Sequence, residues 1–202
     1  MEIVGINHDL LENTDENYNN GASTAMLSWM TYVLVPKITN VNNSMKNYSG
    51  IEGESHRAGG GWELSDLRTE LNGALLNALD STGVLQSGIK PVQKISDHGR
   101  YHPNEPATTV DKIWVPSNTE LNYESSSMVV AEQGTPYKLY TDIFSRIKYI
   151  YDSKNNYVAA PYWTRSTHTI SHQWYYVAAT GAPYSLNAGN GQTCYICFGF
   201  CL

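Results

Sequence analysis

The stretch Ser65-Asp-Leu-Arg-Thr-Glu-Leu-Asn-Gly-Ala-Leu-Leu-Asn-Ala-Leu79 has the clearest periodicity in the chain. Leucines recur along it at every fourth position: Leu67, Leu71, Leu75 and Leu79. This is the spacing of one face of an α-helix. Ser65 is a favourable N-cap residue, and Asp66 places a negative charge at the positive end of the helix dipole. The stretch therefore predicts an amphipathic helix whose leucine face packs on a core.

A second helix is expected near the N-terminus. Between Ser23 and Val35 the apolar residues recur at helical spacing, and Pro36 ends the run. Short strands are expected at Glu2–Asn7, Ile113–Val115, Ala160–Arg165, Gln173–Ala178 and Cys194–Leu202. Large aromatic side chains should join the leucines in the core: Trp62, Trp114, Trp163, Phe198 and Phe200. With no internal repeat and no linker-like segment, we expect one α+β domain over residues 1–202.

The C-terminal quarter of the chain has an unusual composition. Residues 153–202 contain neither Asp nor Glu, so all 19 acidic residues lie at or before Asp152. Tyr, Trp, Asn, Ser, Thr, His and Gly are abundant there instead. This mixture is typical of binding loops, because Tyr and Trp supply contact area with few rotatable bonds while Ser, Asn and Gly adapt their hydrogen bonds. Two interpretations stay open: a recognition surface, or the Tyr-rich edge of an ordinary β-sheet.

The bulk composition argues against several partners. The formal net charge is -6, and Lys and Arg form no cluster, so a nucleic-acid partner is not expected. The longest mainly apolar stretch, Ala25–Val35, is too short to span a bilayer, so we expect no membrane insertion. The N-terminus lacks a basic segment followed by an apolar run, and we therefore expect no secretory signal peptide of the usual type.

No residue pattern indicates a metal site. Three cysteines fall in the last expected strand: Cys194, Cys197 and Cys201. In a strand, residues three apart point to opposite faces, and residues four apart are separated by ~13 Å. These cysteines should therefore be small buried side chains rather than metal ligands. Two histidine pairs have the spacing i,i+4, His98/His102 and His168/His172, but neither lies in a predicted helix with a nearby carboxylate.

No pattern indicates catalysis either. His8 and Asp9 could supply two members of a catalytic triad, but no Gly-x-Ser-x-Gly nucleophile motif accompanies them. The acid-free segment 153–202 cannot supply a carboxylate acid or base. We therefore expect no enzymatic activity, no metal and no cofactor.

Five segments, taken in order, resemble a known family. They are Asn7-His8-Asp9; Gly60-Gly-Trp-Glu-Leu-Ser-Asp-Leu-Arg-Thr-Glu-Leu-Asn72; Asp111-Lys-Ile-Trp-Val-Pro-Ser-Asn-Thr-Glu120; Tyr162-Trp-Thr-Arg-Ser166; and Phe198-Gly-Phe-Cys201. Together they resemble the DUF6273-type domains of Firmicutes and their phages, over nearly the whole chain. Such domains are similar to the C-type-lectin-like, formylglycine-generating-enzyme-like architecture. The resemblance implies an α+β fold with two helices around a small, twisted, mostly antiparallel sheet with long loops.

The same architecture carries the variable proteins of diversity-generating retroelements, whose diversified residues lie near the C-terminus on a surface held by core strands. By this resemblance Trp163, Arg165 and the segment Phe198–Cys201 would be scaffold. The ligand-binding display would consist of ten residues: Thr167, His168, Thr169, Ser171, His172, Tyr176, Tyr184, Ser185, Asn187 and Asn190. The Arg-Gly-Gly-Ser-Trp motif and the copper-binding cysteine pair of the enzyme branch are not recognisable, which favours binding over catalysis.

The resemblance implies a non-enzymatic ligand- or receptor-binding domain, either a phage or prophage tail-tip adhesin or a retroelement-diversified variable protein. Its expected location is the virion tail tip or the bacterial cell surface. Expected partners are a host cell-surface protein or glycan, other virion or tail proteins and, by analogy with tail tips, further copies in a homo-trimer. Two alternatives stay open: a structural virion or tail-assembly domain and, less favoured, an enzyme of the formylglycine-generating-enzyme-like fold.

Overall fold

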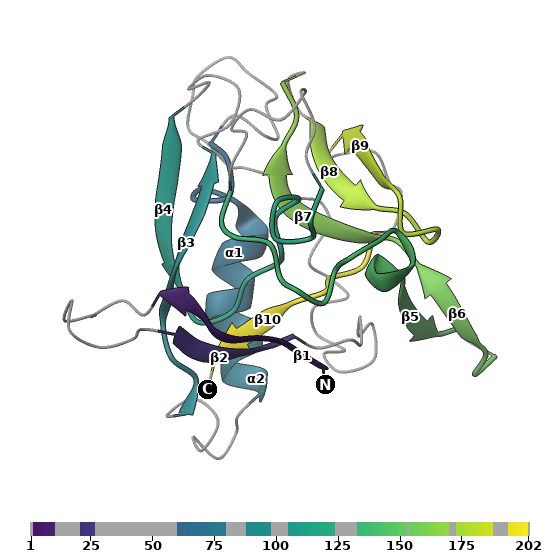
Figure 1. Ribbon diagram of the computed structural model, residues 1–202, viewed down its shortest axis with the longest axis horizontal. Helices are drawn as coiled ribbons and strands as arrows, with labels where there is room; N and C mark the ends of the chain where they lie inside the picture. Colours follow the sequence, from purple (N-terminus) through teal and green to yellow (C-terminus); the bar gives the residue numbers. More distant parts are fainter. Residues whose placement is uncertain are drawn as a thin grey trace.

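The computed structural model describes the following residues: 2–10, 21–26, 60–79, 88–97, 105–123, 133–152, 154–169, 173–187 and 194–201. This part of the protein is mostly β-structure. It contains four small antiparallel sheets and one helical segment of several turns (Figure 1).

The leucine-rich stretch forms the predicted helix, and its middle turn is π-helical. Three pieces follow one another without a break: α1 (Asp66–Glu70), η2 (Leu71–Leu75) and α2 (Leu76–Leu79). The Ser65 hydroxyl oxygen accepts a hydrogen bond from the Arg68 backbone N–H at 3.1 Å, which is the expected N-cap. The large side chains predicted for the core are buried: Trp62, Leu67, Leu71, Leu75, Trp114, Trp163, Phe198 and Phe200. The predicted helix and its core-facing leucines are therefore confirmed.

Segments from the two ends of the chain meet in one sheet. β1 (Glu2–Leu10) pairs with β2 (Gly21–Met26), and β2 pairs with β10 (Gly199–Cys201). The second helix predicted from Ser23 is wrong at its start, because residues 23–26 belong to β2; residues 27–35 lie outside the described part. A short apolar run fits helical and extended structure equally well, and pairing on both edges of β2 decides for the strand.

A two-stranded sheet runs beside the helix (Figure 1). It pairs β3 (Val92–Asp97) with β4 (Pro106–Asp111). Asp111, at the end of β4, fastens this sheet to the helix. Its carboxylate accepts hydrogen bonds from Trp62 Nε1 at 2.9 Å and from Arg68 Nε at 2.7 Å.

The second half of the chain builds two more sheets, preceded by the short 3-10 helix η3 (Phe144–Arg146). Their strands are β5 (Lys148–Tyr151), β6 (Tyr157–Ala160), β7 (Tyr162–Thr167), β8 (Gln173–Val177) and β9 (Pro183–Asn187). β5 pairs with β6, and β8 lies between β7 and β9. A second buried cluster joins the two sheets: Leu121, Tyr137, Tyr140, Ile150, Ala160, Tyr162, Val177 and Cys197.

The predicted α+β, C-type-lectin-like architecture with two helices around one sheet is contradicted. In the described residues one helical segment, 66–79, accompanies four small antiparallel sheets, so the fold is mostly β. The sequence does not predict β9, because its five residues lie between glycines that favour turns. Pairing with β8 stabilises such a short run once the chain has folded.

Candidate functional site

The sheet β7–β8–β9 carries most of the described residues predicted for display. Thr167, at the end of β7, is buried, so the prediction that its side chain is exposed is wrong. Its backbone N–H and its hydroxyl donate to the Asp97 carboxylate at 3.0 Å and 2.6 Å. Asp97 ends β3, so these two bonds draw the end of β7 into the interior. Thr167 therefore joins two sheets instead of facing solvent.

The side chains on β8 and β9 that were predicted for ligand display divide between the two faces of the sheet. Tyr176 lies directly opposite Tyr184, and their ring centroids are 6.1 Å apart. Ser185 follows Tyr184 and points to the other face, because side chains alternate along a strand. There its hydroxyl donates to Gln173 Oε1 at 2.9 Å. Ser185 therefore does not share a face with Tyr176 and Tyr184, although all three belong to the expected display.

His168 belongs to the face that carries Ser185. Its ring centroid lies 5.3 Å from that of Tyr175, and Tyr175 is directly opposite Ser185 in the β8–β9 register. Partial burial lowers the pKa of His168 below its ordinary value of 6.5, so the imidazole is neutral at pH 7. A neutral imidazole can both donate and accept a hydrogen bond, which suits a polar ligand.

The other predicted display residues are less fully described. Thr169 is exposed. Asn187 is placed in β9 by its backbone alone, and three residues lie outside the described part: Ser171, His172 and Asn190.

Tyr184 is the exposed aromatic residue of the opposite face, with 55% of its surface accessible. The partly buried Tyr176 supports it and in turn packs edge-on against Trp163, with centroids 6.2 Å apart. Trp163 is buried in the main core. A row of rings thus connects an exposed tyrosine to the interior.

A second exposed aromatic group, which is not among the residues predicted for display, lies on the β5–β6 hairpin. Tyr149 and Tyr151 alternate along β5, and Tyr157 is directly opposite Tyr151. The Tyr157 ring stacks on that of Tyr149, with centroids 4.6 Å apart and planes inclined by 16°, and lies 5.4 Å from that of Tyr151. The three residues are 37%, 47% and 59% exposed in chain order, and we call them the tyrosine cluster. The alternation Lys148-Tyr-Ile-Tyr151 was the available signal, since a strand places every second residue on one face.

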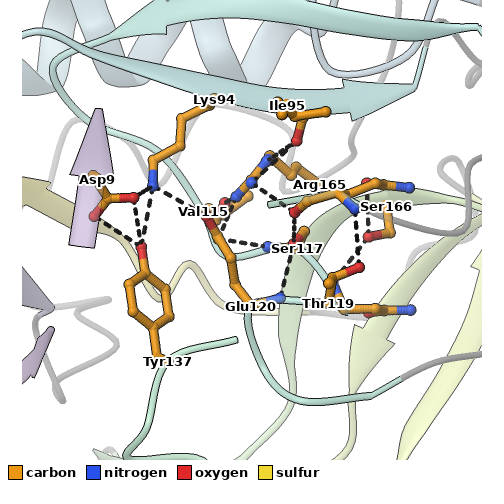
Figure 2. A network of polar contacts seen from close by, with 12 residues as sticks. Asp9, Lys94, Ile95, Val115, Ser117, Thr119, Glu120, Tyr137, Arg165 and Ser166 are labelled. Atoms are coloured by element: carbon orange, nitrogen blue, oxygen red, sulfur yellow. Dashed lines mark hydrogen bonds and ion pairs between the residues drawn. The ribbon is translucent and has the colours of Figure 1, made fainter. Parts of the chain in front are cut away.

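A network of buried charges lies where β1, β3, β7 and the segment 115–120 approach one another (Figure 2). We call it the buried ionic network, and it consists of Asp9, Lys94, Glu120, Tyr137 and Arg165. Glu120 is its central member. One carboxylate oxygen accepts from Lys94 Nζ at 3.0 Å, and the other accepts from Arg165 Nη1 at 2.5 Å.

The charges of this network keep Glu120 ionised. Burial alone would raise the pKa of the Glu120 carboxyl, but the positive charges of Arg165 and Lys94 outweigh it and hold the pKa below its ordinary value of 4.5. Arg165 donates further bonds to the backbone oxygens of Ile95, Val115 and Gln133. Arg165 and Trp163 both lie in the interior, as a scaffold role requires.

The three cysteines considered for chemistry have interior positions, whereas His98 and His102 lie outside the described part. Cys194, Cys197 and Cys201 are buried thiols that form no disulfide, and burial raises the pKa of Cys194 to about 12. Among the described residues, no group of three or more His, Cys, Asp or Glu side chains is arranged to hold a metal ion. No helix in the described part is long and apolar enough to cross a membrane.

Comparison with known proteins gives one match. Residues 12–195 match the family described as "Domain of unknown function (DUF6273)". No curated protein and no solved structure matches the chain. The family match spans most of the sequence, from just after β1 to the start of the last described segment, 194–201. The chain therefore belongs to the DUF6273 family.

Proposed function

We propose that this chain is a non-enzymatic receptor-binding domain of a phage or prophage tail tip, or of a bacterial cell surface. Its partner is a host cell-surface protein or glycan, and exposed tyrosine rings make the main contacts. The observation that carries this proposal is the tyrosine cluster on β5–β6, in which the exposed Tyr157 ring contacts the exposed rings of Tyr149 and Tyr151.

The cluster has the properties of an energetically dominant contact. Tyrosine offers a large ring surface for stacking and a hydroxyl for hydrogen bonding, and few rotatable bonds need to be ordered on binding. The rings of Tyr149 and Tyr157 already stack on each other, which lowers the entropy lost when a ligand covers them. On the other face of the hairpin, Ile150 and Ala160 belong to the second core cluster, so the hairpin is fastened to the body.

The sheet β7–β8–β9, which we call the C-terminal sheet, supplies further candidate contacts. Tyr184 is exposed on one face, and His168 and Ser185 lie on the other. The absence of acidic residues after Asp152 also suits a surface that binds neutral or anionic partners. We therefore propose Tyr184 and His168 as secondary contacts, outside the tyrosine cluster.

The arrangement of ionisable groups favours binding over catalysis. Lys94 and Arg165 are buried, and both donate to the buried carboxylate of Glu120. Such groups stabilise the scaffold more readily than they reach a soluble substrate.

The test is a binding assay with the fluorescently labelled full chain on a panel of Firmicutes cells. Tyr151→Ala and Tyr157→Ala should each weaken binding by about 2 kcal/mol or more, roughly 30-fold in Kd, if the cluster is a hot spot. Phe144→Ala is the matched control, because Phe144 is 74% exposed on η3 and is not part of the cluster. Binding by both tyrosine variants at the parent's affinity, with unchanged melting temperatures, would exclude the cluster as the contact surface.

Pretreatment of the cells identifies the class of receptor. Loss of binding after protease treatment indicates a protein, and loss after periodate oxidation indicates a glycan. Absence of binding to every cell type, together with co-purification with other tail proteins, would support the structural tail-assembly alternative instead.

A further inference from the structure

Lys94 projects from β3 into the protein interior, where several oxygen atoms surround its ammonium nitrogen (Figure 2). Lys94 Nζ is in direct contact with a carboxylate oxygen of Asp9 on β1. It also lies 3.0 Å from Glu120 Oε1 and 3.1 Å from the Tyr137 hydroxyl. The Trp114 ring covers the same nitrogen, with its centroid at 3.9 Å. All five side chains are buried, so an amine and two carboxyl groups meet in a site shielded from bulk water.

We propose that Lys94 and Asp9 become joined by an intramolecular isopeptide bond that the folded chain forms on its own. A proton passes from Lys94 Nζ to the Asp9 carboxylate oxygen that it contacts, and the resulting amine attacks Cγ of the protonated carboxyl group. A C–N bond forms, the bond from Cγ to the hydroxyl oxygen breaks, and the hydroxyl leaves as water with one proton from the nitrogen. The products are one amide and one water molecule. No electrons are transferred, so no oxidant, metal or cofactor is needed.

Glu120 is placed to move the proton in this reaction. One of its oxygens lies next to Lys94 Nζ, while Arg165 Nη1 and the Ser117 backbone N–H hold the other oxygen at 2.5 Å and 3.1 Å. Because its pKa is held below the ordinary value, Glu120 is a carboxylate that can accept a proton from the attacking nitrogen. It can then return that proton to the departing hydroxyl.

Tyr137 is placed to polarise the carboxyl group that is attacked. Its hydroxyl lies 3.4 Å and 3.3 Å from the two oxygens of Asp9. Burial, followed by the negative charges of Glu120 and Asp9, raises the pKa of Tyr137 well above its ordinary value of 10.0. The hydroxyl therefore keeps its proton and can donate it as a hydrogen bond to Asp9, which makes Cγ more electrophilic.

The energetics of burial favour the bonded product. Taking an ammonium and a carboxylate out of water is costly even when the two are paired, whereas the neutral amine, acid and amide avoid this cost. Reactants held in contact can also react with an effective molarity on the order of 10⁵ M or more. After the bond forms, Glu120 and Arg165 remain as one carboxylate and one guanidinium in contact, so the product site stays electrically balanced.

The bond would fasten β1 to β3 across a sequence separation of 85 residues. The three cysteines form no disulfide, so the described part has no such crosslink that could do the same. This inference concerns the scaffold and does not depend on the proposed receptor binding.

The test is the intact mass of the purified full chain under denaturing conditions. The expected mass is lower than that of the sequence by one water molecule. Tryptic digestion should give a branched peptide that joins the segments around Asp9 and Lys94, with no cleavage after Lys94. A chain of full sequence mass, even after prolonged incubation of the folded protein at raised temperature, would overturn the proposal. A water loss confined to a linear peptide would also overturn it, since that is a succinimide at an aspartate.

Variants test the roles of the individual groups, and the mass can be read even if a variant is poorly folded. Lys94→Met and Asp9→Ala should have the full sequence mass, and Glu120→Gln should form the bond many-fold more slowly or not at all. Lys90→Met is the matched control, because Lys90 is exposed just before β3, and it should keep the water loss. Bond formation in Glu120→Gln at the parent's rate would refute the role of Glu120 as proton carrier.

Discussion

Replacing Arg165 with methionine removes the one guanidinium that the C-terminal sheet contributes to the buried ionic network. Arg165 is fully buried, and it donates to Glu120 at 2.5 Å and to the backbone oxygen of Val115 at 2.9 Å. It also donates to the backbone oxygens of Ile95 and Gln133. Methionine fills much of the same volume but donates to none of these oxygens. The variant therefore leaves a buried carboxylate short of a counter-charge and three carbonyl groups short of a donor.

The expected loss of stability follows from these contacts. Removing one partner of a buried ion pair costs about 3–5 kcal/mol. The lost bonds to the backbone oxygens add to this cost, although Gln133 O keeps its bond from the Ser117 hydroxyl, so the first figure is a lower estimate. Since whole domains are stable by about 5–15 kcal/mol, we expect Arg165→Met to be largely unfolded or close to it at 37 °C.

Urea unfolding followed by tryptophan fluorescence measures this loss, because the tryptophans of the described part are buried: Trp62, Trp114, Trp163 and Trp174. Lys154→Met is the matched control, since Lys154 is exposed in the β5–β6 turn, and it should change the free energy of unfolding by less than about 0.5 kcal/mol. The double variant Arg165→Met/Glu120→Gln should recover part of the loss if the unpaired carboxylate is its main cause. Parent-like stability of Arg165→Met would refute the view that this network holds the C-terminal sheet.

The Arg165–Glu120 pair also predicts how the stability lost in Arg165→Met depends on pH. The folded-state pKa of Glu120 lies below its ordinary value of 4.5, so ionised Glu120 stabilises the parent above that pH. This contribution disappears as the pH falls through the folded-state pKa. In Arg165→Met the carboxyl loses its guanidinium, so its pKa should rise and a neutral carboxyl should be tolerated. The difference in stability between parent and variant should therefore be largest above pH 5 and should narrow in acid.

Three further outcomes test the packing. Leu71→Ala should lower the free energy of unfolding by about 2–5 kcal/mol in the same urea assay, because Leu71 is fully buried in the main core. Gly181→Ala should lower the melting temperature sharply, because an added Cβ would lie 1.9 Å from the Ile143 backbone oxygen. The residue also has φ +82°, and this backbone strain alone costs about 1–3 kcal/mol for alanine. Cys194 should react slowly with a maleimide at pH 8 in the folded protein and rapidly in urea, because burial raises its pKa to about 12; rapid labelling of the folded chain would contradict its buried position.

Local patterns predicted the parts of the fold that depend on neighbouring residues. The recurrence of leucine at Leu67, Leu71 and Leu75 and the N-cap at Ser65 depend on contacts within a few turns of one helix. β8 was also predicted nearly in full and β7 in part, over residues 162–165, because both consist mainly of β-branched and aromatic residues. The helix expected from Ser23 failed because the pairing partners of β2 come from both ends of the chain.

The residues predicted for display divide between two faces for a reason that follows from strand geometry. Tyr184 and Ser185 are neighbours in the sequence, so composition groups them, but a strand separates them onto opposite faces. Thr167 is buried because of Asp97, which lies 70 residues away, and no local pattern shows that contact. Lys94 had a usable signal: it alternates with Val92 and Ser96, which face the interior with it. A charged residue in a core-facing position of a strand indicates a buried partner, although it does not identify that partner.

Because the chain has no acidic residue after Asp152, the last segment depends on earlier acids for its buried polar contacts. Segment 153–202 contains two cationic side chains, Lys154 and Arg165, and Arg165 is the buried one. Because its own segment has no carboxylate, Arg165 pairs with one from earlier in the chain, Glu120. The Thr167 hydroxyl likewise donates to Asp97. The C-terminal sheet is thus fastened through β7 to acids that lie earlier in the chain, while β8 and β9 take no part in those bonds. Substitutions on the outer residues of β8 and β9 should therefore alter the surface without disturbing the anchor, which is the separation that a recognition domain with a changeable surface requires.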